Sequence, residues 1–177
     1  MITFDSEKCL EDAIYEAMEG GRNPIDDSSV QYCGRQVDLG GYGTIDLVAV
    51  NVAKDGDAMR EISITLIELK NEKLKLENLV QIAKYRTAMT RLVSEDGFKN
   101  CNVDVNCILV FKDSDPCNGE WPFILQNIGW LDSYQFTFSF DDGVFFRLID
   151  GYTKSDERLG VAQKSIFDII GLKKRDE

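Results

Sequence analysis

Residues 44–52 read TIDLVAVNV and residues 61–70 read EISITLIELK, and these two runs decide the fold. β-branched and apolar residues dominate both runs, so each predicts a strand. The segment between them, Lys54-Asp55-Gly56-Asp57, is typical of a turn. We therefore expect two adjacent strands joined by a hairpin connection.

The apolar face of the second strand ends in charge. Because side chains alternate between the two faces of a strand, Glu68 and Lys70 continue its apolar face. Asp46 lies on a comparable face of the first strand, which it shares with Val48 and Val50. If the strands pair, Asp46 and Glu68 come close enough to share a cation. The apolar residues that precede the charges on the second strand are Ile62, Ile64 and Leu66.

Two neighbouring carboxylates repel each other and need a proton or a metal ion between them. Mg²⁺ or Mn²⁺ suits such a pair, because hard divalent ions prefer oxygen ligands and Mg²⁺ often accepts just one or two carboxylates. Lys70 could then orient or deprotonate a water molecule, or neutralise a phosphate. This set is typical of metal-assisted phosphodiester hydrolysis. The alternative is a solvated ion pair at the strand ends with no chemistry attached.

Working outward, the pattern predicts an α+β fold with a mixed central sheet. Three consecutive strands followed by a helix and a further strand favour that class. The expected elements are, in chain order, a helix that begins after Asp5 or Ser6 and ends at Gly20-Gly21, strands at 30–38, 44–52 and 61–70, a helix at 74–93 and a strand at 101–111.

Residues 112–177 are expected to form a β-rich extension packed on the same domain as residues 1–111. Two strands, near 134–140 and 143–150, flank Asp141-Asp142-Gly143, which is typical of a hairpin turn. A short helix is expected near 161–170. The prediction is therefore a core over 1–111 and an extension over 112–177.

The composition excludes several classes of function. The 177 residues contain no histidine, which rules out His-based acid–base catalysis, Ser-His-Asp and Cys-His nucleophiles and His-ligated zinc. The net charge of −11 argues against a non-specific polybasic DNA binder. Five cysteines without a Cys-x-x-Cys pair, no long apolar run and no signal-peptide pattern predict a cytoplasmic protein with free thiols and no membrane association.

Five short motifs, in this order along the chain, resemble the PD-(D/E)XK nuclease superfamily and its RecB-like branch. The likeness is greatest to the C-terminal nuclease domain of NucS/EndoMS-type endonucleases. It implies a restriction-endonuclease-like αβββαβ core. The motifs are Ser6-Glu7-Lys8-Cys9-Leu10-Glu11-Asp12, Gly34-Arg35-Gln36, Gly43-Thr44-Ile45-Asp46, Ile67-Glu68-Leu69-Lys70 and Gln81-Ile82-Ala83-Lys84-Tyr85.

The resemblance also implies roles for individual residues. The implied metal ligands are Asp46, Glu68, the Leu69 backbone carbonyl and Glu11. The implied catalytic set adds Lys70 as the catalytic lysine, with Gln81 and Tyr85 supporting the site or contacting the DNA backbone, and Arg35 contacting nucleic acid. Alternatives stay open: Tyr85 as a core aromatic, Gln81 as a solvated residue, and Glu7 or Glu16 in place of Glu11.

Residues 70–91 carry six basic and two acidic side chains, a local excess of positive charge in an acidic chain. A strip that faces phosphates would explain this excess, and so would a solvated helix face. We expect DNA contacts from Lys73, Lys75 and Lys84 in particular. The basic residues are Lys70, Lys73, Lys75, Lys84, Arg86 and Arg91.

The leading interpretation is a Mg²⁺- or Mn²⁺-dependent DNA endonuclease. Two alternatives remain. One is a catalytically inactive, nuclease-like protein that binds a protein partner or mimics nucleic acid. The other is the nuclease subunit of a larger defence or transposition complex, in which a protein partner supplies recognition. A homodimer is also left open.

Overall fold

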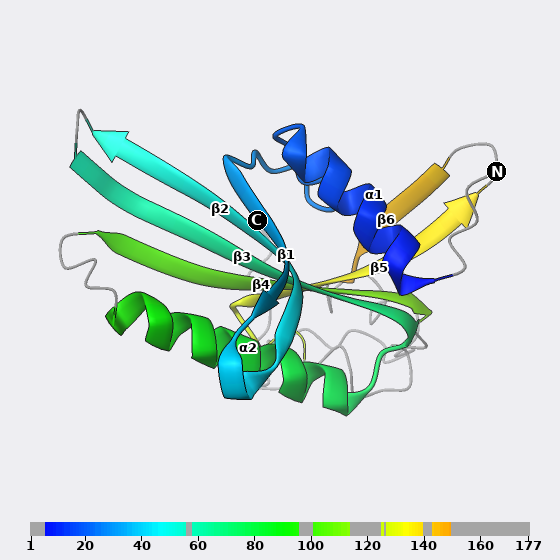
Figure 1. Ribbon diagram of the computed structural model, residues 1–177. Coiled ribbons are helices and arrows are strands. Elements are labelled where there is room, and N and C mark those ends of the chain that lie inside the picture. Colours follow the sequence, from blue (N-terminus) through cyan, green and yellow to red (C-terminus); the bar gives the residue numbers. More distant parts are fainter. Residues whose placement is uncertain are drawn as a thin grey trace, which may run out of the picture.

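A six-stranded sheet with one helix on each face organises the chain (Figure 1). The computed structural model describes residues 6–55, 58–95, 101–113, 125, 127–139 and 143–149. The elements in these ranges are α1 (Glu7–Glu19), β1 (Tyr32–Asp38), the short 3₁₀ helix η1 (Gly40–Tyr42), β2 (Thr44–Asp55), β3 (Ala58–Lys73), α2 (Leu76–Glu95), β4 (Asn102–Asp113), β5 (Leu131–Ser139) and β6 (Gly143–Leu148).

The strands follow one another across the sheet in chain order. β1, β2 and β3 are antiparallel to one another, β4 runs parallel to both β3 and β5, and β6 is antiparallel to β5. The predicted α+β class with a mixed sheet is therefore confirmed. β5 and β6 belong to the predicted extension and continue the same sheet. Asp141, Asp142 and the helix expected near 161–170 lie outside the described residues.

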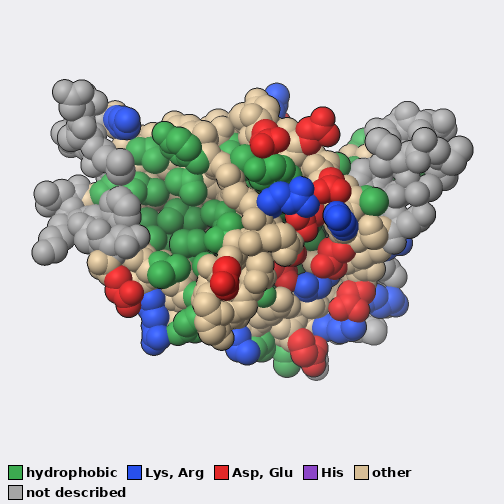
Figure 2. Space-filling model, viewed as in Figure 1, with side chains coloured by type: hydrophobic (Ala, Val, Ile, Leu, Met, Phe, Trp, Pro, Cys, Tyr) green, Lys and Arg blue, Asp and Glu red, His purple; other side chains and the backbone are tan. Residues whose placement is uncertain are grey.

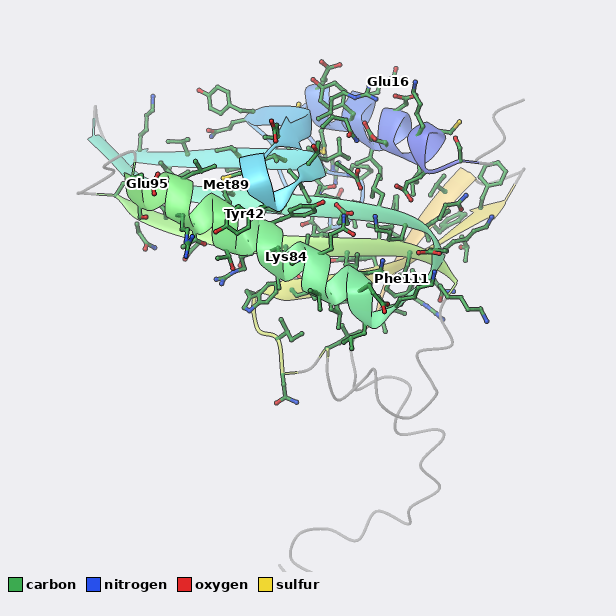
Figure 3. The ribbon with its side chains drawn as sticks, turned by 60° about the horizontal axis from the view of Figure 1, so that its bottom comes forward. Glu16, Tyr42, Lys84, Met89, Glu95 and Phe111 are labelled. Atoms are coloured by element: carbon green, nitrogen blue, oxygen red, sulfur yellow. The ribbon has the colours of Figure 1, made fainter. Side chains whose placement is uncertain are left out.

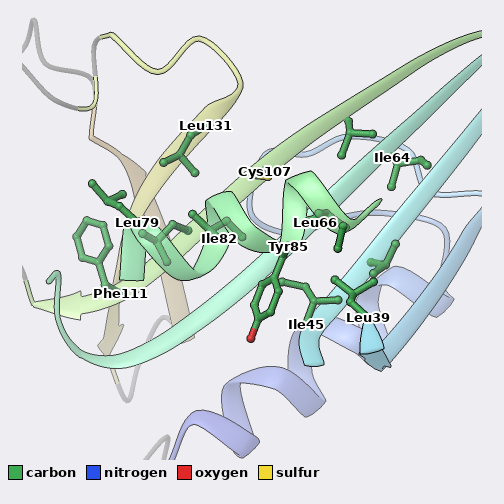
Figure 4. Close-up of a cluster of buried hydrophobic side chains, with 14 of the residues drawn as sticks. Leu39, Ile45, Ile64, Leu66, Leu79, Ile82, Tyr85, Cys107, Phe111 and Leu131 are labelled. Carbon is green, nitrogen blue, oxygen red and sulfur yellow. The ribbon is translucent and has the colours of Figure 1, made fainter. Parts of the chain in front are cut away.

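The two helices cover opposite faces of the sheet, as Figure 3 shows. α1 begins at the N-cap Ser6, whose hydroxyl accepts a hydrogen bond from the backbone N–H of Cys9 at 3.3 Å. Leu10, Ile14 and Met18 recur every four residues and bury one side of α1 against the sheet. On the other face, α2 packs against β2, β3 and β4 in a second apolar cluster (Figure 4). The buried residues that α2 contributes to it are Leu79, Ile82, Tyr85 and Ala88.

The regular alternation of β2 is interrupted at Asp46. Ile45 packs in the cluster under α2, whereas Leu47 packs in the cluster under α1. Two residues that are two apart in a regular strand would share a face. The β1–β2 ladder pairs residues on both sides of this point and skips Gln36 and Asp46 themselves. At this local irregularity the Asp46 side chain is only partly buried, whereas its neighbours Ile45 and Leu47 are fully buried.

Two further predictions concern cysteines and membrane spans. The described cysteines Cys9, Cys33, Cys101 and Cys107 are all free thiols. Within the described ranges, no helix combines the length and the apolar character needed to cross a bilayer.

Candidate functional site

Asp46, Glu68 and Lys70 come together where β2 begins and β3 nears its end. Leu47 of β2 pairs with Ile67 of β3, so the next step along both strands brings Asp46 opposite Glu68. Lys70 Nζ donates a hydrogen bond to Glu68 Oε1 at 2.6 Å. The Leu69 backbone N–H donates to Asp46 Oδ2 at 2.8 Å. The three side chains that the sequence places at these strand ends therefore form one cluster.

Glu68 is the most deeply buried charged side chain of this cluster, with 1% of its surface exposed. β3 lies between β2 and β4, and Glu68 pairs in register with the buried Leu109 of β4. Its Oε1 accepts the Lys70 hydrogen bond, whereas its Oε2 is buried and accepts none from any described group. A buried carboxylate oxygen without a donor is costly, and it is the kind of atom that a cation would satisfy.

The electrostatics of the pair follow from this burial. Burial, and then the charge of the nearby Asp46 carboxylate, raise the pKa of Glu68 to about 7 against the lowering effect of the Lys70 ammonium. Burial also raises the pKa of Asp46, against the lowering effect of the Leu69 N–H and of Lys70. Each carboxylate is thus hard to ionise, as expected for a pair that would share one cation.

Lys70 responds in the opposite way to the same surroundings. Burial alone lowers the pKa of Lys70, but the hydrogen bond to Glu68 and the charges of Glu68, Glu7 and Asp46 outweigh it, so the pKa is raised overall. The Lys70 side chain is 15% exposed, so its ammonium is partly shielded from solvent. Lys70 therefore stays protonated at neutral pH and acts as a fixed positive charge in the cluster.

Glu7, at the start of α1, is a member of this cluster that the sequence left only as an alternative. Its Oε2 accepts a hydrogen bond from the backbone N–H of Asn71 at 3.3 Å. Its charge acts on Asp46, Glu68 and Lys70. The sequence feature that could have identified Glu7 is its position in the first turn of α1, four residues before Glu11 and hence on the same face of the helix.

Glu11, one of the implied metal ligands, has protein donors on both of its carboxylate oxygens. Its Oε1 accepts from Arg35 Nε at 3.0 Å, and its Oε2 accepts from Gln36 Nε2 at 2.8 Å. Both oxygens of this buried carboxylate are therefore occupied by protein donors. Arg35 also pairs with Asp12 at 2.8 Å and lies over the ring of Tyr15, so its charge is directed at α1. Gln36 connects Glu11 to Asp46 Oδ1, 3.2 Å away.

Gln81 and Tyr85 lie one turn apart on α2. Gln81 Nε2 donates to the Tyr85 hydroxyl at 2.7 Å, which is the contact expected of residues four apart on a helix. The Tyr85 ring is buried and lies beside Ile45 in the apolar cluster (Figure 4). Its hydroxyl lies against Gly43, where an added Cβ would come within 3.3 Å of it. Tyr85 is thus a core aromatic that also supports the turn leading to Asp46.

The basic residues of 70–91 do not form one continuous strip. Lys75 pairs with Glu72 at 2.5 Å. Arg86 donates to the Val105 carbonyl and lies over Trp130, and Arg91 donates to the Tyr42 hydroxyl. Figure 2 shows basic side chains interspersed with acidic ones on the face in view. The exposed lysines of the segment include Lys73 and Lys84, and Lys84 lies on α2 (Figure 3).

The donor set fits a divalent cation held by few protein ligands. Within the described ranges, no three acidic or cysteine side chains lie close enough to hold a metal ion by themselves. Asp46 and Glu68 are nevertheless adjacent, and Glu68 Oε2 is a buried acceptor with no described donor. Mg²⁺ is often bound by one or two carboxylates, with water and phosphate completing its octahedron. The Leu69 carbonyl remains a predicted further ligand.

Comparison with protein-family models, with curated proteins and with solved structures found no match to this chain. The functional interpretation therefore depends on the geometry of the cluster.

Proposed function

We propose that this chain is a metal-dependent DNA endonuclease that hydrolyses phosphodiester bonds, with Mg²⁺ or Mn²⁺ bound by Asp46 and Glu68. The observation that carries the proposal is the buried Glu68 Oε2, which has no described donor and lies beside a second carboxylate and a protonated lysine. A divalent ion bound there would activate a water molecule and polarise a phosphate.

The chain's own side chains would each have a distinct role. Asp46 would be held in place by the Leu69 N–H, and its carboxylate would be one ligand of the ion. Glu68 would hold both the ion and, through its Oε1, the Lys70 ammonium. The raised pKa of Lys70 favours a role as a cation that neutralises the phosphate and orients water, rather than as a base.

The restriction-endonuclease-like core belongs to this proposal. The order α1-β1-β2-β3-α2-β4 and the placement of the carboxylates on adjacent strands both support the resemblance to PD-(D/E)XK nucleases. In that interpretation Gln81 and Tyr85 stabilise the entry to β2. Glu11 supports the site from behind Asp46, and a cytoplasmic location is expected.

A plasmid-nicking assay with Mg²⁺ or Mn²⁺ tests the proposal. Glu68→Ala and Lys70→Ala should each reduce cleavage at least about a hundredfold, because the first removes a proposed metal ligand and the second removes the cation that would neutralise the phosphate. Glu72→Ala and Lys54→Ala are matched controls, since Glu72 and Lys54 are exposed on the same two strands away from the pair. Undiminished metal-dependent cleavage by both site variants would contradict the assignment.

A second candidate is a nuclease-like binding protein that engages a basic partner or mimics nucleic acid. The net charge of −11 favours it, as do the described acidic partners of basic residues such as Arg35 and Lys75. Calorimetric titration with Mn²⁺ separates the two candidates. A nuclease should bind Mn²⁺ at a site that Asp46→Ala abolishes, whereas a mimic has no need of that site.

The cleavage assay and the Mn²⁺ titration together also distinguish a third candidate, the nuclease subunit of a larger complex. Such a subunit would bind Mn²⁺ at Asp46 but would cleave DNA only after a partner protein is added. Several of the described cations, among them Arg35, Lys75, Arg86 and Arg91, are engaged by protein acceptors, which is consistent with recognition supplied by a partner.

A further inference from the structure

Gln36 adopts a backbone conformation that its residue type disfavours. Its φ is +47°, in the left-handed region where glycine, asparagine and aspartate are the usual residues. It lies inside β1, at the point where the ladder with β2 skips the Gln36–Asp46 pair. Strain of this kind persists where the surrounding structure demands it, and it concentrates at functional sites.

The side chain of Gln36 uses this conformation to reach two carboxylates at once. Its Nε2 lies 2.8 Å from Glu11 Oε2 and 3.2 Å from Asp46 Oδ1. An amide nitrogen carries two hydrogens, so each carboxylate receives one. The opposite amide orientation would place an oxygen against both carboxylates, which is electrostatically unfavourable. The arrangement therefore requires an amide at this position.

Asp46 is consequently held from both sides. Its Oδ1 accepts from Gln36 on β1 and its Oδ2 from the Leu69 N–H on β3. The terminal torsion of an aspartate is otherwise broad, so a single donor would leave the carboxylate free to turn. Two donors on the two flanking strands fix its plane, and each oxygen keeps lone-pair capacity for another partner.

We propose that Gln36 is a positioning residue that orients the Asp46 carboxylate for a divalent cation, with Glu11 as the anchor that holds the Gln36 amide. This inference rests on the proposed function, because the cation is the one assigned to Asp46 and Glu68. It also explains the pairing of Glu11 with Arg35, because Arg35 holds the other oxygen of Glu11 at 3.0 Å and keeps the anchor in place. Outer groups of this kind affect metal affinity without touching the metal.

Calorimetric Mn²⁺ titration of the full chain at fixed pH tests the inference with two variants. Gln36→Met keeps the length of the side chain and removes its amide. Gln36→Gly removes the amide and also relieves the left-handed backbone. Both should weaken Mn²⁺ binding by about 10- to 100-fold. Thermal unfolding of the metal-free protein, measured in parallel, should show that the Gly variant is more stable than the Met variant, because both lose the amide but only the Gly variant relieves the left-handed backbone.

Gln31→Met is the matched control. Gln31 also makes two side-chain hydrogen bonds, to the backbone carbonyl and N–H of Val52, but these lie away from Asp46. Its Mn²⁺ affinity should equal that of wild type. Asp46→Ala, which should bind no Mn²⁺ at this site, establishes that the measured binding belongs to the cluster.

The outcomes separate the two proposals. If wild type binds Mn²⁺ through Asp46 but both Gln36 variants bind equally well, the positioning role is overturned and the metal site stands. If Gln36→Gly binds normally and only Gln36→Met is weak, the backbone rather than the amide matters, and the role is again overturned. If wild type binds no Mn²⁺, the proposed metal site fails and the inference fails with it.

Discussion

Two buried glutamates lie in adjacent regions of this molecule, and their surroundings differ sharply. Glu11, between α1 and β1, is 6% exposed and has both oxygens occupied by Arg35 and Gln36. Glu68, between β2 and β4, is 1% exposed and has one oxygen occupied by Lys70 and one without a described donor. The fold has thus fully compensated one buried charge and only half compensated the other.

The difference teaches how to separate a structural carboxylate from a candidate ligand. A buried charge whose lone pairs are met by protein donors supports the fold, and breaking it is costly. A buried charge that keeps an acceptor free destabilises the fold until a proton or a cation arrives. Burial and residue type are the same in both cases, so only the hydrogen-bond partners distinguish them.

The largest expected effect is on the stability of the compensated region. Glu11→Ala should lower the free energy of unfolding of the metal-free protein by about 3 kcal/mol, because it removes the buried carboxylate that accepts from both Arg35 and Gln36. Urea denaturation measures this. Asp12→Ala is the control: Asp12 is an exposed partner of the same Arg35, and its loss should cost about 0.5 kcal/mol or less. Equal losses of unfolding free energy in Glu11→Ala and Asp12→Ala would contradict the structural role assigned to Glu11.

The half-compensated region should make stability depend on pH. Because the pKa of Glu68 is raised from 4.5 to about 7, the folded state holds its proton more tightly than the unfolded chain does. The stabilisation of the folded state by this tightly held proton is fully present below about pH 4.5 and is lost as pH rises through about 7. The shift corresponds to roughly 3 kcal/mol, and the raised pKa of Asp46 acts in the same direction.

Unfolding in the presence of a chelator, at about pH 5 and about pH 8, measures this dependence. Wild type should be less stable at the higher pH, and Glu68→Gln should remove most of the difference. Glu72→Gln, which changes an exposed glutamate of the same strand, should leave it intact. A flat profile in wild type would mean that Glu68 is as well compensated as Glu11.

A bound metal ion should compensate the charge of Glu68 as protein donors already compensate that of Glu11. Mn²⁺ at a hundred times its Kd should stabilise the fold by about 2.7 kcal/mol, since it binds the folded state alone. Differential scanning fluorimetry would detect this as a rise in Tm. Asp46→Ala should show no rise, whereas Asp12→Ala should show the full rise. A metal-induced rise in Asp46→Ala would place the ion elsewhere.

The smallest expected effect concerns the hydrogen bond between Gln81 and Tyr85, which supports the turn that leads to Asp46. Tyr85→Phe removes the 2.7 Å hydrogen bond from Gln81 and leaves the ring in the core, so it should cost about 1 kcal/mol. Urea denaturation of Tyr85→Phe, Gln81→Ala and the double variant checks this. The double variant should cost no more than the larger single effect, because both single changes break one bond. Additive losses would contradict the pairing.

Much of the fold could be predicted from local pattern. The strands at 44–52 and 61–70 are rich in β-branched and apolar residues, so their positions needed no tertiary information. That Asp46, Glu68 and Lys70 come together also follows from the pairing of the two strands. The interruption at Asp46 could not be predicted, because it coincides with a left-handed Gln36 on another strand and no local pattern in residues 44–52 indicates it.

The partners of several candidate residues could not be predicted, for one physical reason. Glu7 and Glu11 both lie on α1, and the sequence does not show which of them pairs with Gln36 and which with the backbone of Asn71. Arg86 and Arg91 were assigned either to a phosphate-facing strip or to a solvated helix face, and their partners come from β4 and η1. Contacts between distant segments determine these side chains, and a helical pattern carries no information about them.

The contact between Gly43 and Tyr85 has a consequence for what can replace residue 43. Gly43 has a φ of +112°, a backbone conformation that disfavours any side chain, and an added Cβ would also come within 3.3 Å of the Tyr85 ring and hydroxyl. A smaller residue at 85 would relieve the contact but not the backbone conformation. Glycine is therefore favoured at 43 for two independent reasons, and only one of them involves Tyr85.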